Sequence, residues 1–291
     1  MEPIILPVAP IGYRPQSVDC SIEADLLQFE LLRRWSPTQR LMQAGSLMRS
    51  ARQLSLNAHR QRFPHLSTTE LGQKLAQTWL QEYCPIAYVP TGTEMTWIQD
   101  SIQLAAQLHQ LFETNGISYY VTDGVAAVAY GETRTTQDLD IVLAVDLASL
   151  AQIGTIFETA GFYVSGLDDV ISQRMSSFQI TQIATISRAD LMIPVESEFS
   201  RIQLSRRQTI PISIGKDVYF ASPEDVIINK LIWGSKSQSE KQWRDVLSIM
   251  KTQRECLDYN YLREWADKLG MMPDYLRATI EAGVNNLTNL L

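Results

Sequence analysis

Residues 120–143 read Tyr120-Val-Thr-Asp-Gly-Val-Ala-Ala-Val-Ala-Tyr-Gly-Glu-Thr-Arg-Thr-Thr-Gln-Asp-Leu-Asp-Ile-Val-Leu143. Asp138 and Asp140 stand two residues apart at the entrance of an apolar run that predicts a buried strand. Residues two apart in a strand point to the same face, so we expect the two carboxylates to lie together. Such carboxylates repel each other unless a cation lies between them, and oxygen donors of this kind favour Mg²⁺ or Mn²⁺. The pair therefore predicts a divalent-metal site suited to phosphoryl or nucleotidyl transfer.

The residues before this pair are suited to binding phosphate. Asp123 and Gly124 stand between a predicted strand and a short helix of small residues. Gly124 lets the backbone approach a phosphate closely, and the start of a helix carries a partial positive charge. Arg134 and Thr136 then precede the acidic pair and could hold phosphate oxygens. An ordinary surface arginine is the alternative interpretation of Arg134.

This stretch resembles the signature of the DNA polymerase β-like nucleotidyltransferase superfamily, in which a Gly-Gly or Gly-Ser pair precedes Asp-apolar-Asp-apolar. It is most similar to the AbiEii-type branch, where Gly-Gly-x-Ala…Gly…Arg-x-Thr-x-Asp-apolar-Asp-apolar is typical. The matching residues are Gly124, Ala126, Gly131, Arg134, Thr136, Asp138 and Asp140. Asp123 stands where the branch has glycine. The resemblance covers roughly residues 94–284.

The resemblance also implies three site residues further along the chain. Asp190 would be the third metal-binding carboxylate, on a neighbouring strand, with a turn acid as the alternative. Lys230 would reach the nucleotide phosphates, and Asp245 would position Lys230 or the acceptor. From the residues alone, Lys230 could instead extend its amine from an apolar helix to water, and Asp245 could pair with Lys241.

The hydrophobic pattern predicts helices, then mixed helices and strands, then helices again, and together with the resemblance this implies an α+β fold in three parts. These are an extended arm with an N-terminal helical module (1–90), a mixed β-sheet nucleotidyltransferase core (91–221) and a C-terminal helical subdomain (222–291). Helices are expected within 21–83, including 70–83 behind a capping box at Ser67. The core is expected to contain helices 94–114 and 147–160, and strands 117–121, 141–145, 162–165, 178–186, 189–193, 208–214 and 217–220. The last four helices are expected at about 222–233, 239–252, 258–269 and 273–284.

Composition narrows the class of protein. The 291 residues are 45% hydrophobic and 20% charged, as in globular proteins. No apolar stretch is long enough for a transmembrane helix, and three scattered cysteines fit neither a disulfide framework nor a zinc site, so we expect a cytoplasmic protein without a signal peptide. The sequence also has no P-loop, nucleophile elbow or HExxH motif, which excludes those enzyme classes.

The net charge of −7 argues against general nucleic-acid coating, but no acidic residue lies between Glu30 and Glu70. The arginines in that interval are Arg33, Arg34, Arg40, Arg49, Arg52, Arg60 and Arg62. They are typical either of a solvated helical face or of a patch that binds RNA.

These observations predict a metal-dependent nucleotidyltransferase that uses an NTP such as ATP and either Mg²⁺ or Mn²⁺. The acceptor would be an RNA end, a protein or a small molecule. The AbiEii-type resemblance implies a toxin of a toxin–antitoxin pair, with an antitoxin as partner. One alternative is a non-catalytic nucleotide- or RNA-binding protein on the same fold. Another is a structural or antitoxin-like protein whose function resides in residues 1–90.

Overall fold

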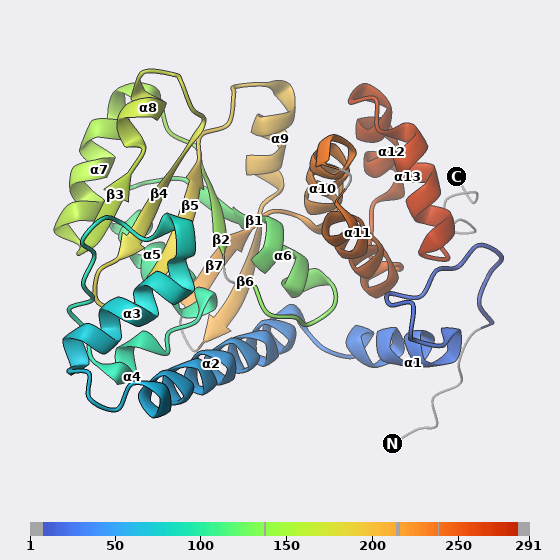
Figure 1. Ribbon diagram of the computed structural model, residues 1–291. Helices are drawn as coiled ribbons and strands as arrows, with labels where there is room; N and C mark the ends of the chain where they lie inside the picture. The colour runs from blue at the N-terminus through green and yellow to red at the C-terminus, as the bar shows by residue number, and fades with distance from the viewer. Residues whose placement is uncertain (1–7, 137, 214–215, 238, 285–291) are drawn as a thin grey trace.

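The structure is a computed structural model that describes residues 8–136, 138–213, 216–237 and 239–284 (Figure 1). Residues 1–7 of the predicted extended arm lie outside the described residues. A mixed sheet lies at the centre, with helices before and after it in the chain, so the predicted α+β fold class is confirmed. Among the described residues, no helix combines the length and apolar character needed to cross a membrane.

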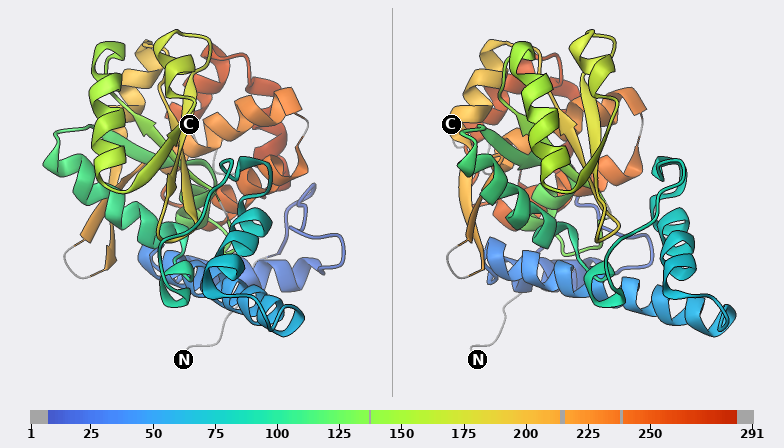
Figure 2. Two further views of the ribbon diagram at one scale, coloured as in Figure 1. Left: turned by 60° about the vertical axis from the view of Figure 1, so that its left-hand side comes forward. Right: turned by 90° about the vertical axis from the view of Figure 1, so that its left-hand side faces the viewer.

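The stretch 21–83, predicted to be helical, contains three α-helices, which we call the N-terminal module. They are α1 (Ile22–Arg33), α2 (Pro37–Arg62) and α3 (Thr68–Leu80), and the short 3₁₀ helix η1 (Gln81–Tyr83) follows. Each α-helix begins after a serine whose side chain accepts a backbone N–H of the first turn, which satisfies a donor without a partner in the helix. At Ser67, the capping box with Glu70 is present as predicted. Figure 2 shows α2 running along one end of the sheet and α3 rising from its far end.

Seven strands form one sheet in the order β3-β4-β5-β2-β1-β7-β6. The strands are β1 (Tyr119–Thr122), β2 (Leu139–Leu143), β3 (Phe162–Ser165), β4 (Ser177–Gln182), β5 (Ser187–Met192), β6 (Gln208–Ser213) and β7 (Lys216–Phe220). β2 is parallel to β5 and antiparallel to β1, and β7 is parallel to β1. The middle strand β2 begins beside Asp138, and its antiparallel neighbour β1 ends just before Asp123.

The helices around the sheet are α4 (Glu94–Trp97), α5 (Ser101–Thr114), α6 (Asp123–Tyr130), η2 (Leu147–Ser149), α7 (Leu150–Thr159), α8 (Leu167–Ile171) and α9 (Glu198–Arg206). Phe112 of α5 packs edge-on against Phe157 of α7, which places both helices over the same part of the sheet. The prediction of one helix over 94–114 was wrong, because the Asp100 side chain accepts the backbone N–H groups of Ile102 and Gln103 and starts a separate helix there. The short helices α8 and α9 were not predicted.

Strand ends also differ from the predictions. β2 begins at Leu139 rather than at residue 141, and β4 ends at Gln182 rather than at residue 186. The chain turns after β4, where Ile186 has a positive φ of 55° that a continuous strand could not include.

The C-terminal helices are α10 (Pro223–Ser237), α11 (Glu240–Gln253), α12 (Tyr259–Lys268) and α13 (Met272–Glu281), as predicted within a few residues. α10 and α11 both pack against α6, and α1 packs against α11. The N-terminal module therefore contacts the core through α2 and the C-terminal helices through α1 (Figure 1).

Candidate active site

Two of the three predicted carboxylates lie side by side on the parallel strands β2 and β5, and the third lies just before β2. Asp140 of β2 is the register partner of Asp190 on β5, and Asp138 lies two residues before Asp140. Asp138 itself precedes β2, which begins at Leu139, and its negative charge acts on Asp140. Asp190 is thus not an isolated turn acid, because it belongs to a paired strand beside Asp140.

The three carboxylates and Asp123 affect one another's ionisation. Burial, followed by the negative charges of Asp123, Asp190 and Asp138, raises the pKa of Asp140 from 3.8 to about 7. Burial also raises the pKa of Asp190, against the opposing effect of Arg188. One oxygen of Asp190, Oδ1, is buried with no hydrogen-bond partner among the described residues. The carboxylates of Asp138, Asp140 and Asp190, called the carboxylate cluster below, therefore repel one another, and a bound cation would relieve that repulsion.

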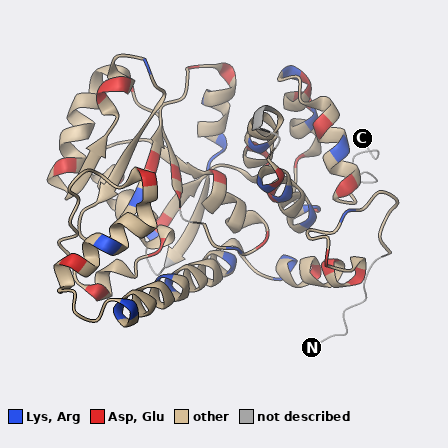
Figure 3. Ribbon diagram, viewed as in Figure 1, with Lys and Arg blue, Asp and Glu red and all other residues tan. Residues whose placement is uncertain are grey.

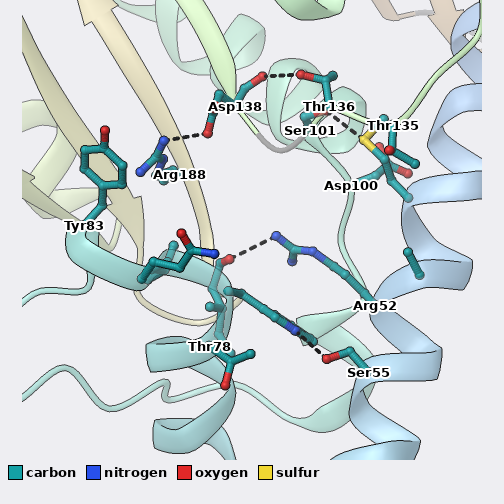
Figure 4. Close-up of a pocket in the computed structure, with 16 residues that line it drawn as sticks. Arg52, Ser55, Thr78, Tyr83, Asp100, Ser101, Thr135, Thr136, Asp138 and Arg188 are labelled. Atoms are coloured by element: carbon teal, nitrogen blue, oxygen red, sulfur yellow. Dashed lines mark hydrogen bonds and ion pairs between the residues drawn. The ribbon is translucent and has the colours of Figure 1, made fainter.

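Arg188 is a site residue that the sequence analysis did not select. Its Nη2 donates to Asp138 Oδ1 at 2.5 Å and lies 3.7 Å from Asp190 Oδ2 (Figure 4). The guanidinium also lies 3.7 Å from the ring centroid of Tyr83 in η1. Because residues 188 and 190 alternate to the same face of β5, the period of the strand contained the signal that would have found Arg188.

Lys230 reaches the site from α10 and is almost fully buried. Its Nζ donates to Asp123 Oδ1 at 2.5 Å and to Gln242 Oε1 at 2.7 Å, and it lies 2.8 Å from Asp245 Oδ2. The amine therefore does not extend to water, and Asp245 holds it as the resemblance implied. Asp245 does this instead of the alternative intrahelical pairing with Lys241.

Arg134 belongs to the same group of polar side chains as Lys230 and Asp245. Its guanidinium gives two hydrogen bonds to the carboxylate of Asp245, from Nε to Oδ1 at 3.0 Å and from Nη2 to Oδ2 at 2.7 Å. Burial acts to raise the pKa of Asp245, but Lys230 and Arg134 outweigh it and hold the pKa below its ordinary value. Arg134 is thus neither a free surface arginine nor an open phosphate ligand here, and its predicted contact with nucleotide stays a prediction.

Two unusual residues, Asp123 and Gly124, lie at the turn from β1 into α6, and the geometry of this turn explains why each occurs there. A Cβ on Gly124 would lie 2.7 Å from Thr136 Oγ1, so only glycine fits against the loop that leads to Asp138. Asp123 has a φ of +46°, in the left-handed region where glycine is favoured and aspartate is among the better tolerated substitutes. The extra carboxylate is compensated by its ion pair with Lys230.

The chemistry of the carboxylates fits a divalent metal, because Asp140 and Asp190 offer adjacent oxygen donors, one of them unpaired. Among the described residues, however, no group of three or more His, Cys, Asp or Glu side chains is already arranged to hold a metal ion. We attribute the lack of such a group to Asp138, because this carboxylate already forms an ion pair with Arg188. Metal ligation by all three would require Asp138 to leave Arg188.

The seven arginines predicted as an RNA patch are spread along the N-terminal helices (Figure 3), and most of them bind other parts of the protein. Arg40 is buried and donates to the carbonyl oxygens of residues 129, 32 and 35. Arg52 donates to three backbone carbonyls and a serine of the core. Arg33, Arg49 and Arg60 pair with acidic residues. The stretch is therefore not the continuous exposed basic face on which the RNA prediction depended.

No protein-family model matches the sequence, and no curated protein matches it significantly. Solved structures with a similar chain path include an antigenic nucleotidyltransferase-like protein from Paracoccidioides brasiliensis, 18% identical, with a TM-score of 0.42 over 63% of this chain and 93% of that one. The antibiotic-resistance factor ANT(2'')-Ia matches in a solution structure at 14% identity and a TM-score of 0.42, over 60% of this chain and 94% of that one.

A crystal structure of ANT(2'')-Ia with adenylyl-2''-tobramycin matches at 13% identity and a TM-score of 0.36, over 62% of this chain and 97% of that one. At this level of similarity, the chemistry of the site has to be judged from its own residues. The AbiEii-type branch stays a prediction.

Proposed function

We propose that the protein is a metal-dependent nucleotidyltransferase that moves a nucleoside monophosphate from an NTP to an acceptor hydroxyl. The observation that carries this proposal is the side-by-side position of Asp140 and Asp190 on parallel strands, with Asp138 beside them. Carboxylates placed together at this cost to their ionisation are typical of sites that handle cations. The Gly124 turn and the Lys230 amine lie close to the same cluster and supply groups suited to a triphosphate.

In this proposal, Mg²⁺ or Mn²⁺ held by Asp138, Asp140 and Asp190 would polarise the α-phosphoryl group and stabilise the charge of the leaving pyrophosphate. The turn at Gly124 receives phosphate oxygens. Lys230 exchanges its bond to Asp123 for one to a phosphate, while Asp245 keeps its amine in position.

The reaction forms one bond and breaks one. The acceptor oxygen bonds to the α-phosphorus, and the bond from that phosphorus to the bridging oxygen of the β-phosphate breaks. Pyrophosphate leaves with the electron pair, and the hydroxyl proton passes to a carboxylate of the cluster or to water. The task of the protein is mainly to position the reactants and stabilise charge, as in other phosphoryl transfers.

The test uses purified protein with Mg²⁺ or Mn²⁺, each α-labelled NTP and a mixed acceptor extract containing RNA, protein and small molecules. We expect label to move to an acceptor with the wild type and not with Asp138→Asn or Asp140→Asn. Asp217→Asn, at an exposed carboxylate of β7, is the matched control and should transfer normally. Equal transfer by all four proteins would show that the carboxylate cluster is not the catalytic site.

A second candidate function is favoured by two ion pairs. Arg188 engages Asp138, and Asp123 engages Lys230, so groups needed for catalysis are already satisfied within the protein. A nucleotide-binding protein without catalysis would keep them so. It would show metal-dependent nucleotide binding, lost in Asp140→Asn, and no labelled product with any acceptor.

A further inference from the structure

A cavity of about 460 Å³ opens directly beside the carboxylate cluster (Figure 4). Asp138, Thr136 and Arg188 line it on the side of the core. The opposite wall comes from the N-terminal module, with Ala51 and Ser55 among the residues of α2 and Tyr83 among those of η1. Because Asp138 is shared between the cavity and the cluster, a molecule in the cavity is next to the proposed reaction centre.

The cavity is distinct from the cluster proposed to hold the triphosphate. Lys230, Gln242 and Asp245 are not among the described residues that line it. Its volume is within the range of sites that enclose a small organic molecule, roughly 300–1,000 Å³. The position and size fit a second, smaller substrate beside the nucleotide.

The charges in the wall are already balanced. Arg52 and Arg188 face Asp100 and Asp138, and each of these four groups has a partner in the protein. Arg52 donates to backbone carbonyls, and Asp100 pairs with Arg49 and caps α5. A polycationic ligand would find no surplus of carboxylates, and a polyanion would find no unpaired guanidinium.

The rest of the lining is suited to a neutral ring. Residues with side-chain hydroxyls line the cavity from several elements, namely Ser55, Thr78, Ser101, Thr135 and Thr136. The hydroxyls of Thr78, Ser101 and Thr136 already donate within the protein, and each can still accept a hydrogen bond. Tyr83 rests one face on Arg188 yet remains 45% exposed, which leaves ring surface for a ligand to cover. Hydroxyl groups that give and accept hydrogen bonds, beside an aromatic face, are suited to a saccharide ring.

The backbone at the edge of the cavity is strained where the module reaches the site. Gln81, which also lines the cavity, has a φ of 51° and a ψ of −123°, an unusual conformation for a residue with a side chain. The turn ends α3 and places Tyr83 over Arg188. Strain of this kind is retained where surrounding contacts hold it, and it gathers at functional sites.

We propose that this cavity binds the acceptor, a neutral, polyhydroxylated small molecule of the saccharide type, and presents one of its hydroxyls beside Asp138. The ribose of a nucleoside has the same chemistry, and the arms of the test distinguish the two sources. Only the role as acceptor rests on the proposed transferase function, because binding in the cavity can be measured without any reaction.

The test is titration calorimetry on the full-length protein with glucose, sucrose, adenosine, kanamycin and a single-stranded RNA. Ala51→Trp places an indole in the cavity without removing a polar contact, because Ala51 is an exposed lining residue of α2. Leu54→Trp is the matched control on the same helix, 70% exposed and not among the lining residues. Circular dichroism checks that both variants are folded.

We expect a saccharide or adenosine to bind, Ala51→Trp to weaken that binding by about tenfold or more, and Leu54→Trp to leave it within about twofold of the wild type. Binding of kanamycin or RNA alone, equal binding by Ala51→Trp, or no binding of any probe would overturn the proposal. Labelled-NTP transfer is measured separately. If a ligand binds in the cavity but no nucleotide is transferred, only the proposed transferase function is refuted. If Ala51→Trp transfers nucleotide as well as the wild type does, only the proposed role of the cavity as acceptor site is refuted.

Discussion

Replacing Asp123 tests whether its ion pair with Lys230 restrains nucleotide binding. Asp123 has a left-handed backbone conformation, at a position where the sequence signature that this chain resembles has glycine. Its carboxylate lies 2.5 Å from Lys230 Nζ. A triphosphate at the Gly124 turn would meet both the negative charge of Asp123 and a lysine already engaged. We therefore predict that Asp123→Asn and Asp123→Gly bind nucleotide more tightly than the wild type.

The magnitude follows from the exposure of the pair. The Asp123 side chain is 36% exposed, so its attraction for Lys230 is screened and worth at most about 1 kcal/mol. If Lys230 no longer has to break this ion pair to bind a phosphate, the Kd for nucleotide falls about fivefold. Removing the repulsion between the Asp123 carboxylate and the phosphates brings the change toward tenfold. The free energy of unfolding should change by no more than about 1 kcal/mol in either variant, because Lys230 keeps its ion pair with Asp245. In Asp123→Gly, the relief of backbone strain at the positive φ offsets the larger conformational entropy of glycine in the unfolded chain.

The two variants separate charge from backbone strain. Asparagine removes the charge and tolerates the positive φ, whereas glycine removes the charge and the strain together. The assay is equilibrium titration with a fluorescent ATP analogue, with and without Mg²⁺, and Asp217→Asn serves as the control. Unchanged affinity in both variants would refute the reasoning, because Lys230 would then not face the nucleotide. Weaker Mg²⁺-dependent binding would instead identify Asp123 as a metal ligand.

Three further predictions concern stability. Lys230→Met leaves Asp245 with Arg134 alone in a buried setting, so urea unfolding should show a loss of about 3 kcal/mol; a loss below about 1 kcal/mol would contradict the role of the ion pair. In metal-free protein, Asp140 keeps a proton that the unfolded chain releases, so stability should fall as pH rises from 3.8 to about 7. Asp140→Asn should remove the part of that fall that Asp140 causes, and the difference between the unfolding midpoints of wild type and variant across this pH range measures it. Arg52→Ala leaves buried carbonyls without donors, so it should cost about 2 kcal/mol and speed proteolysis of the N-terminal module; wild-type resistance would argue against this docking contact.

The acidic pair was predictable because its geometry is local. Asp138 and Asp140 are only two residues apart in the chain, so they lie near each other whatever the surrounding sheet. The place of Asp190 was different, because β5 pairs with β2 only after β3 and β4 have passed to the edge of the sheet. No pattern within either strand specifies that neighbour, and the resemblance alone implied it. Arg188 was different again, because the period of β5 places it on the face of Asp190, and only its contact with Asp138 depends on how the strands pair.

The arginine-rich stretch shows what charge counting does not detect. The interval from Glu30 to Glu70 has no acidic residue, so its arginines had no visible local partners. In the folded chain, Arg40 and Arg52 are satisfied by carbonyl oxygens of the backbone, which every residue carries and no composition reveals. A buried guanidinium with several carbonyl acceptors serves as a packing element, so a lack of nearby acids does not by itself indicate a nucleic-acid surface.

The same contacts bear on the idea that residues 1–90 act alone. Asp25 of α1 is fully buried, and it accepts from Lys251 of α11 at 2.8 Å and from the Tyr13 hydroxyl at 2.5 Å. Arg40 places its Nε 2.8 Å from the carbonyl oxygen of Ala129 in α6. A separated N-terminal module would lose the contacts of Asp25 with Lys251 and of Arg40 with Ala129, which cross its boundary. The module is better understood as a brace between the core and the C-terminal helices. It contacts α6 through α2 and α11 through α1, and it supplies one wall of the cavity beside the carboxylates.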